Sequence, residues 1–114
     1  LTEAELEQYR YFITDALDDL IGAKSHEEAL FVAGPMLTLL CDFIFDTRQQ
    51  WRCVSKRNFR QLEKLDAPLH SELLRGLESF YKRETRDGLV KFTKKLPEPF
   101  GGGLFAGYKV GGKR

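Results

Sequence analysis

The sequence is poor in the residues that build metal centres, disulfide frameworks and nucleophilic active sites. Its 114 residues include two cysteines, Cys41 and Cys53, and two histidines, His26 and His70. No Cys-x-x-Cys pair and no His-Glu-x-x-His motif occurs, so the sequence predicts no zinc site. Two thiols do not make a secreted disulfide scaffold. Cys41 lies in the most apolar stretch, which predicts a buried thiol in a reducing, cytoplasmic setting.

A signal peptide and a long uninterrupted apolar run are also lacking. The N-terminal segment is acidic, whereas a signal peptide begins with a basic region. The longest apolar run, residues 30–45, is interrupted by Gly34-Pro35 and Asp42, and it is shorter than the roughly 20 residues of a membrane span. We therefore expect no membrane partner. The chain begins with Leu1 rather than Met, which predicts a processed protein or a piece of a longer one.

The acidic and glycine-rich stretches lack the partners that would make them cofactor sites. Carboxylates on neighbouring helices can hold a divalent ion, but the Glu-x-x-His motifs of di-iron bundles are absent. The acids in question are Asp15, Asp18, Asp19, Asp42 and Asp46, and we expect solvated side chains, with Asp42 paired to an arginine. Gly101-Gly102-Gly103 is followed by no Gly-Lys-Ser/Thr, which excludes a P-loop. No metal ligand and no catalytic residue is therefore assigned.

What the sequence does contain is a series of capped segments with helical periodicity. Thr2 and Glu5 match a capping box, and Ser25 and Glu28 repeat the same signal. Apolar residues at intervals of three and four predict helices at about 3–21, 29–45 with a kink at Pro35, 55–65, 67–81 and 85–96. We predict an all-α, up-and-down bundle of four to five helices in residues 1–99. A Gly-rich tail, residues 100–114, is predicted to be partly ordered at best, with Leu104, Phe105 and Tyr108 as possible anchors.

Basic residues are concentrated after the apolar segment. Residues 48–64 carry six bases against one acid, whereas residues 1–28 carry eight acids against two bases. Lys56, Arg60 and Lys64 recur every four residues, which places them on one helical face, and Arg52 extends this row if the helix begins early. Cations beside Trp51 suit a phosphate or a nucleotide base. The alternative is a solvated face that balances the acidic first helix, with Asp15, Asp18, Asp42 or Asp46 as partners.

Three stretches together resemble a known family. They are residues 11–20 (YFITDALDDL), Arg52 and Lys56 followed by residues 59–66 (FRQLEKLD), and residues 102–108 (GGLFAGY). Their order and spacing resemble the helical C-terminal region of bacterial proteins with an N-terminal nucleotidyltransferase domain, such as the bundle of kanamycin nucleotidyltransferase. The chain departs from that pattern at Gln49-Gln50-Trp51, where a glycine before the Arg-Trp region is usual.

The resemblance implies a substrate-binding domain without its catalytic half. In such families the N-terminal domain carries Gly-Ser followed by an Asp-x-Asp metal pair, and that signature is absent here. Magnesium and nucleotidyl transfer are therefore expected in a catalytic partner domain or subunit. Trp51, Arg52, Lys56 and Arg60 are the predicted substrate-binding residues.

Two other interpretations remain open from the sequence. The first is a helical interaction module that forms a homodimer or binds another protein and takes no small molecule. The second, which we favour less, is a nucleic-acid binder that uses the basic second half of the chain.

Overall fold

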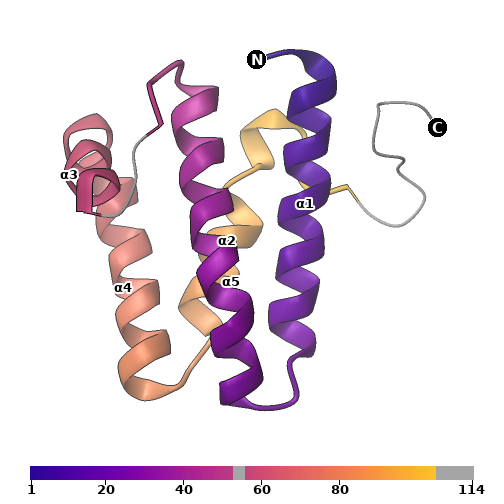
Figure 1. Ribbon diagram of the computed structural model, residues 1–114, viewed down its shortest axis with the longest axis vertical. Helices are drawn as coiled ribbons and strands as arrows, with labels where there is room; N and C mark the ends of the chain where they lie inside the picture. Colours follow the sequence, from indigo (N-terminus) through magenta and orange to yellow (C-terminus); the bar gives the residue numbers. More distant parts are fainter. Residues whose placement is uncertain (53–55, 105–114) are drawn as a thin grey trace.

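Five α-helices and one short 3-10 helix make up the residues that the computed structural model describes, 1–52 and 56–104 (Figure 1). They are α1 (Glu3–Gly22), α2 (His26–Thr47), α3 (Lys56–Leu65), α4 (Ala67–Arg83), α5 (Asp87–Lys95) and η1 (Glu98–Phe100). No strand occurs in the described residues, so the prediction of an all-α bundle is confirmed. The predicted order of the tail beyond residue 104 lies outside them.

The helix starts follow from capping residues that the sequence displays. Thr2 accepts a hydrogen bond from the Glu5 N–H while Glu5 accepts one from Thr2, which completes the capping box of α1. Ser25 caps α2 through the Glu28 N–H, and Asp66 caps α4 through the Leu69 N–H. The predicted cap of α3 at residue 55 lies outside the described residues.

Helix α2 is one continuous helix, although Pro35 lies inside it. The prediction of a single helix across Pro35 is therefore confirmed, because Pro35 costs one backbone hydrogen bond without ending the helix. By length and composition α2 is apolar enough to cross a membrane, and 44% of its most apolar window is buried in the bundle. The central helix of a soluble bundle has the same properties, and the compact fold is compatible with a soluble protein.

The core lies between α1, α2, α4 and α5. Figure 1 shows α1, α2, α4 and α5 running alternately up and down, whereas α3 is seen nearly end-on and crosses the upper end of α4. Fully buried side chains come from all four of these helices: Ile13 and Leu20 of α1, Leu40, Phe43 and Ile44 of α2, Phe80 of α4, and Leu89 and Phe92 of α5. The apolar run predicts a core around Leu37, Leu40 and Ile44, which is confirmed for Leu40 and Ile44, whereas Leu37 is half-buried.

Helix α3 departs from its predicted packing. Leu62 is its one buried residue among those described, whereas Phe59 is 47% exposed. On α4, Tyr81 is 51% exposed although its spacing matches the apolar stripe. The helical spacing of the apolar residues around each of them predicts an inward-facing side chain. Because α3 crosses the end of the bundle, only one side of α3 is covered by α4. The periodic pattern of apolar residues therefore overstates how much of α3 is buried.

Two arginines connect distant parts of the bundle. Arg86 donates hydrogen bonds to the carbonyl oxygens of Leu20 and Ala23 at 2.7 and 2.9 Å, and so satisfies the C-terminal end of α1. Arg10 donates to the carbonyl oxygens of Gly101 and Gly102 at 3.1 and 2.7 Å. The first residues of the tail, 101–104, are thereby held against α1.

Candidate functional site

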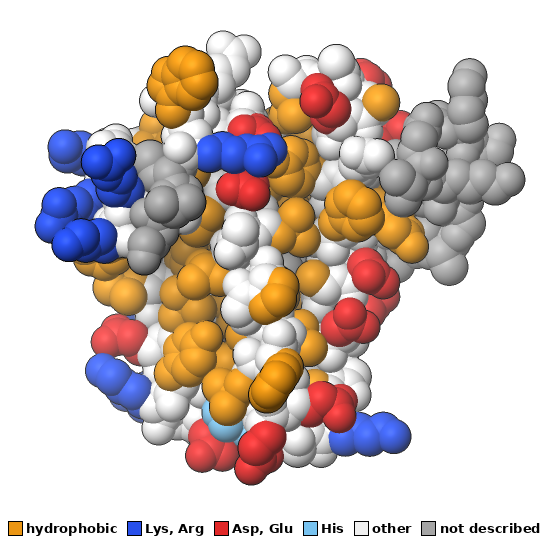
Figure 2. Space-filling model, in the orientation of Figure 1, with side chains coloured by type: hydrophobic (Ala, Val, Ile, Leu, Met, Phe, Trp, Pro, Cys, Tyr) orange, Lys and Arg blue, Asp and Glu red, His pale blue; other side chains and the backbone are white. Residues whose placement is uncertain are grey.

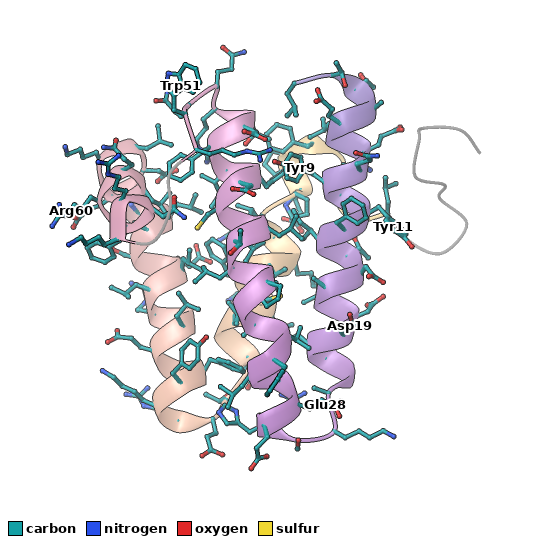
Figure 3. All side chains as sticks on the ribbon, viewed as in Figure 1. Tyr9, Tyr11, Asp19, Glu28, Trp51 and Arg60 are labelled. Carbon is teal, nitrogen blue, oxygen red and sulfur yellow. The ribbon has the colours of Figure 1, made fainter. Side chains whose placement is uncertain are left out.

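Four cations lie on α3 and define the α3 cationic face: Lys56, Arg57, Arg60 and Lys64. All four are exposed. Figure 2 shows Lys and Arg side chains gathered over this helix, and Figure 3 shows Arg60 pointing away from the bundle. No salt bridge within the described part of the chain involves any of the four. The predicted clustering of Lys56, Arg60 and Lys64 on one helix is therefore confirmed.

Trp51 lies beside this face, in the turn that follows α2. The turn is built by Gln49, whose φ of 56° lies in the left-handed region, and by the Gln50 N–H, which donates to the Phe45 carbonyl at 2.8 Å. Trp51 is 93% exposed. Together with Gln50, Gln61 and Lys64 it lines a hollow of about 460 Å³. An aromatic ring, two amides and a cation thus converge on one concave surface.

Arg52 does not extend the row of Lys56 and Arg60, because its guanidinium is engaged by the long helices. It lies outside α3 and makes two hydrogen bonds to Asp46, from Nη2 to Oδ2 at 2.6 Å and from Nε to Oδ1 at 3.2 Å. Its Nη1 lies 3.8 Å from Oδ2 of Asp42. The alternative that Asp42 or Asp46 neutralises a cation of the cluster is therefore confirmed for Arg52. Figure 2 shows a basic side chain between acidic ones at the upper end of α2.

Tyr9 completes this arrangement from α1. Its hydroxyl donates a hydrogen bond to Asp46 and accepts one from Nη2 of Arg52 at 2.9 Å, and Figure 3 shows Tyr9 lying between α1 and α2. Burial, followed by the bond to Asp46, raises the pKa of Tyr9, whereas the Arg52 hydrogen bonds hold the pKa of Asp46 below its usual range. The cluster therefore joins α1, α2 and the segment that follows α2.

The stability of the fold should depend on pH through the ionisation of Asp46, whose pKa is lowered in the folded state. A carboxyl whose pKa is lowered in the folded state stabilises the fold above its unfolded pKa, and that contribution is lost as the pH falls through the folded value. We expect Asp46→Asn to lower the melting temperature by a few degrees near neutral pH and by less at about pH 3, below the ordinary aspartate pKa. Thermal melts across this range measure the difference.

Asp19→Asn is the control, because Asp19 is exposed and takes part in no salt bridge among the described residues. It should change the melting temperature little at either pH. A constant Asp46→Asn effect at all pH values would contradict the assignment.

Sequence reasoning missed Tyr9 and the residues of an apolar cavity around His70. Tyr9 lies 37 residues from Asp46 and 43 from Arg52, and no local spacing connects residues so far apart.

Within the described residues, no group of three or more His, Cys, Asp or Glu side chains is arranged to hold a metal ion.

Comparison with known proteins identifies no relative: no protein-family model, curated protein or solved structure matches this chain. The resemblance to nucleotidyltransferase-domain proteins therefore stays a prediction.

Proposed function

We propose that this chain is a non-catalytic helical domain that presents the α3 cationic face and Trp51 to an anionic group. The observation that carries the proposal is the absence of any salt bridge to Lys56, Arg57, Arg60 or Lys64 among residues 1–52 and 56–104. Arg52, by contrast, is fully paired a few residues away. The protein thus pairs two of the six bases in residues 48–64 internally, Arg48 with Asp66 and Arg52 with Asp46, and leaves the other four directed at solvent.

Charge repulsion and aromatic exposure both favour a ligand at this face. Cations one turn apart on a helix repel each other, so an anion bound between Lys56 and Arg60 relieves an unfavourable interaction. Phosphate is an anion that arginine and lysine both bind through charge-assisted hydrogen bonds. Trp51, which is 93% exposed, offers a flat surface on which a base or a sugar ring can stack. A nucleotide, or a substrate that carries a phosphate group, fits this chemistry.

The resemblance to nucleotidyltransferase-domain proteins supplies the candidate partner. In this proposal the chain is the substrate-binding half, and a catalytic domain or subunit supplies magnesium and the transfer chemistry. Transfer from a nucleoside triphosphate requires metal ions held by carboxylates on a rigid scaffold. The purified chain should therefore show no turnover of ATP with magnesium, and measurable release of pyrophosphate would contradict this.

A paired charge reversal tests the proposal. We expect Lys56→Glu with Arg60→Glu to weaken ATP binding at least about tenfold while the melting temperature stays within about two degrees, because exposed charges contribute about 0–1 kcal/mol each. Trp51, the single tryptophan of the chain, reports binding through its fluorescence.

The matched control is Lys91→Glu with Lys94→Glu, since both lysines are exposed on α5 and the change in net charge is the same. The control should bind ATP nearly as tightly as the parent chain. Equal loss of binding in both pairs would show that net charge alone matters, and strong destabilisation by the α3 pair would show a structural role. Both results would overturn the proposal.

One observation favours the alternative of a helical interaction module. Phe31 on α2 is 86% exposed, and Figure 2 shows hydrophobic side chains gathered over the lower part of α2. A large exposed aromatic residue is typical of a protein-binding surface. Sedimentation over a range of concentrations distinguishes the two functions: self-association that Phe31→Ser abolishes supports an oligomerising module.

A further inference from the structure

Helix α2 forms the middle of one broad face of the bundle, with α1 on one side of it and α3 and α4 on the other (Figure 1). Its exposed residues Phe31, Pro35 and Thr38 are spaced three or four positions apart, so they lie on one side of the helix. Thr38 also lines a hollow of about 270 Å³ between α2, α3 and α4, and Asp42, one turn further along, lines a hollow of about 280 Å³ between α1 and α2. The face therefore has a central ridge, formed by α2, with a hollow on either side.

The hollow between α2, α3 and α4 (the α4 hollow) has a mostly apolar wall that includes Leu37, Leu62, Leu73 and Leu77. Two other large side chains that line it remain in contact with solvent, since Phe59 is 47% exposed and Leu74 is 37% exposed. On the ridge, Phe31 is 86% exposed. Soluble monomers rarely leave so many large apolar side chains exposed together, so this face has the character of a contact surface for another protein.

Helix α1 carries an aromatic residue between acidic ones on the same face. Phe12 is 40% exposed and lines the hollow between α1 and α2, together with Glu5 and Gln8. Asp15 lies one turn after Phe12, so it continues this row along the helix. Within the described residues, neither Glu5 nor Asp15 takes part in a salt bridge. Helix α1 therefore presents an apolar ring flanked by unpaired carboxylates.

The two edges of this face are complementary to each other. Figure 2 shows basic side chains over α3 at one edge, acidic side chains along α1 at the other, and hydrophobic side chains between them. A two-fold axis in the plane of the face and parallel to α2 exchanges the edges, so α1 of one copy faces α3 and α4 of the other. Because a two-fold contact uses the same surface on both copies, one chain supplies both complementary halves.

We propose that two copies of this chain associate through this face, with Phe12 of each copy in the α4 hollow of the other. Asp15 of one copy then approaches Lys56 and Arg60 of the other, which pairs charges that have no salt-bridge partner within the described part of one chain. The Phe31 rings of the two copies meet beside the axis and leave water. This dimer goes beyond the anion-binding function and does not rest on it, although an anion and the second copy compete for the α3 cationic face.

A charge swap, followed by sedimentation equilibrium of the full chain, tests the dimer. Lys56→Glu with Arg60→Glu opposes acids to acids, and Gln8→Lys with Asp15→Lys opposes bases to bases. We expect each double variant alone to dimerise at least about tenfold more weakly than the parent chain. An equimolar mixture of the two should recover the parent affinity to within about threefold, because the mixed dimer pairs opposite charges at both edges.

The control for the charge swap is Lys91→Glu with Lys94→Glu on α5, which lies behind α2 in Figure 1. This pair should dimerise like the parent chain. At concentrations where the chains are monomeric, the variant with Gln8→Lys and Asp15→Lys should bind ATP as tightly as the parent. Loss of the dimer is thereby distinguished from loss of the anion site.

A second comparison tests the apolar contact. Phe12→Ser should weaken the dimer at least about tenfold, because it removes the ring that fills the α4 hollow. Ile21→Ser should leave the dimer unchanged, since Ile21 is also exposed on α1 but lines the hollow between α1 and α5. A parent chain that stays monomeric up to about 1 mM, a charge-swap mixture that does not recover, or equal effects of Phe12→Ser and Ile21→Ser would each overturn the proposal.

Discussion

Leu40→Ala should lower the free energy of unfolding by about 2–5 kcal/mol, because it removes a fully buried side chain from the centre of the bundle. Leu40 is 0% exposed and belongs to the core cluster that α2 shares with α1, α4 and α5. Truncation loses the transfer free energy of the removed atoms and leaves a cavity that the surrounding helices fill incompletely. Denaturant unfolding followed by circular dichroism measures the change.

Phe31→Ala is the control on the same helix. Phe31 is 86% exposed, so its truncation should change the stability of the isolated chain by roughly 0.5 kcal/mol or less. Similar costs for the two variants would show that α2 does not have the inward and outward faces described here.

Gly76→Val should destabilise the fold by about 1–3 kcal/mol or more, because there is no room for a side chain where α4 meets α5. A Cβ at Gly76 would lie 3.2 Å from the Leu89 nitrogen and 3.3 Å from the Gly88 carbonyl carbon, and a Cβ at Gly88 would lie 3.3 Å from the Gly76 Cα. The two glycines thus permit contact between backbones. Backbone atoms cannot rotate away as a flexible side chain can, so the helices must separate.

Gly22→Val is the matched control, since a Cβ at Gly22 meets nothing within 4 Å. The same substitution in open space should change the free energy of unfolding by roughly 0.5 kcal/mol or less, because valine has a somewhat higher helix propensity than glycine and meets no other atom there. If the two variants have equal melting temperatures, α4 and α5 are not in contact at these glycines.

The α3 cationic face and the cluster of Tyr9, Asp46 and Arg52 differ in how far the sequence could indicate them. Lys56, Arg60 and Lys64 are spaced one helical turn apart, so their shared helix could be predicted as soon as the segment was recognised as helical. Arg52 has the same spacing and yet pairs with Asp46 and Asp42 on α2. Periodicity would place Arg52 on the same face as Lys56 only if the helix continued back to it. Because α3 begins at Lys56, Arg52 lies outside the helix.

No pattern in the sequence indicates the cavity that His70 and Asn58 line. His70 looked like an isolated histidine near a helix start, and Cys41 like a small core residue, which it is. Burial raises the pKa of the Cys41 thiol to about 11, so this cysteine is a poor nucleophile at neutral pH. What makes the cavity notable is that Asn58, on a different helix, lines the same space as His70.

The sequence by itself determined where helices begin and which stretch is central. Caps such as Thr2 with Glu5 join residues three apart, and the core position of Leu40 follows from the apolar run around it, so both are visible locally. Tertiary structure alone decided that α3 crosses the bundle, that Tyr9 joins Arg52 to Asp46, and that Gly76 meets Gly88. These contacts depend on how helices cross, and side chains from several helices jointly determine that geometry. Local periodicity fixes the face of each helix, whereas the partner of that face is chosen by the packing of the whole chain.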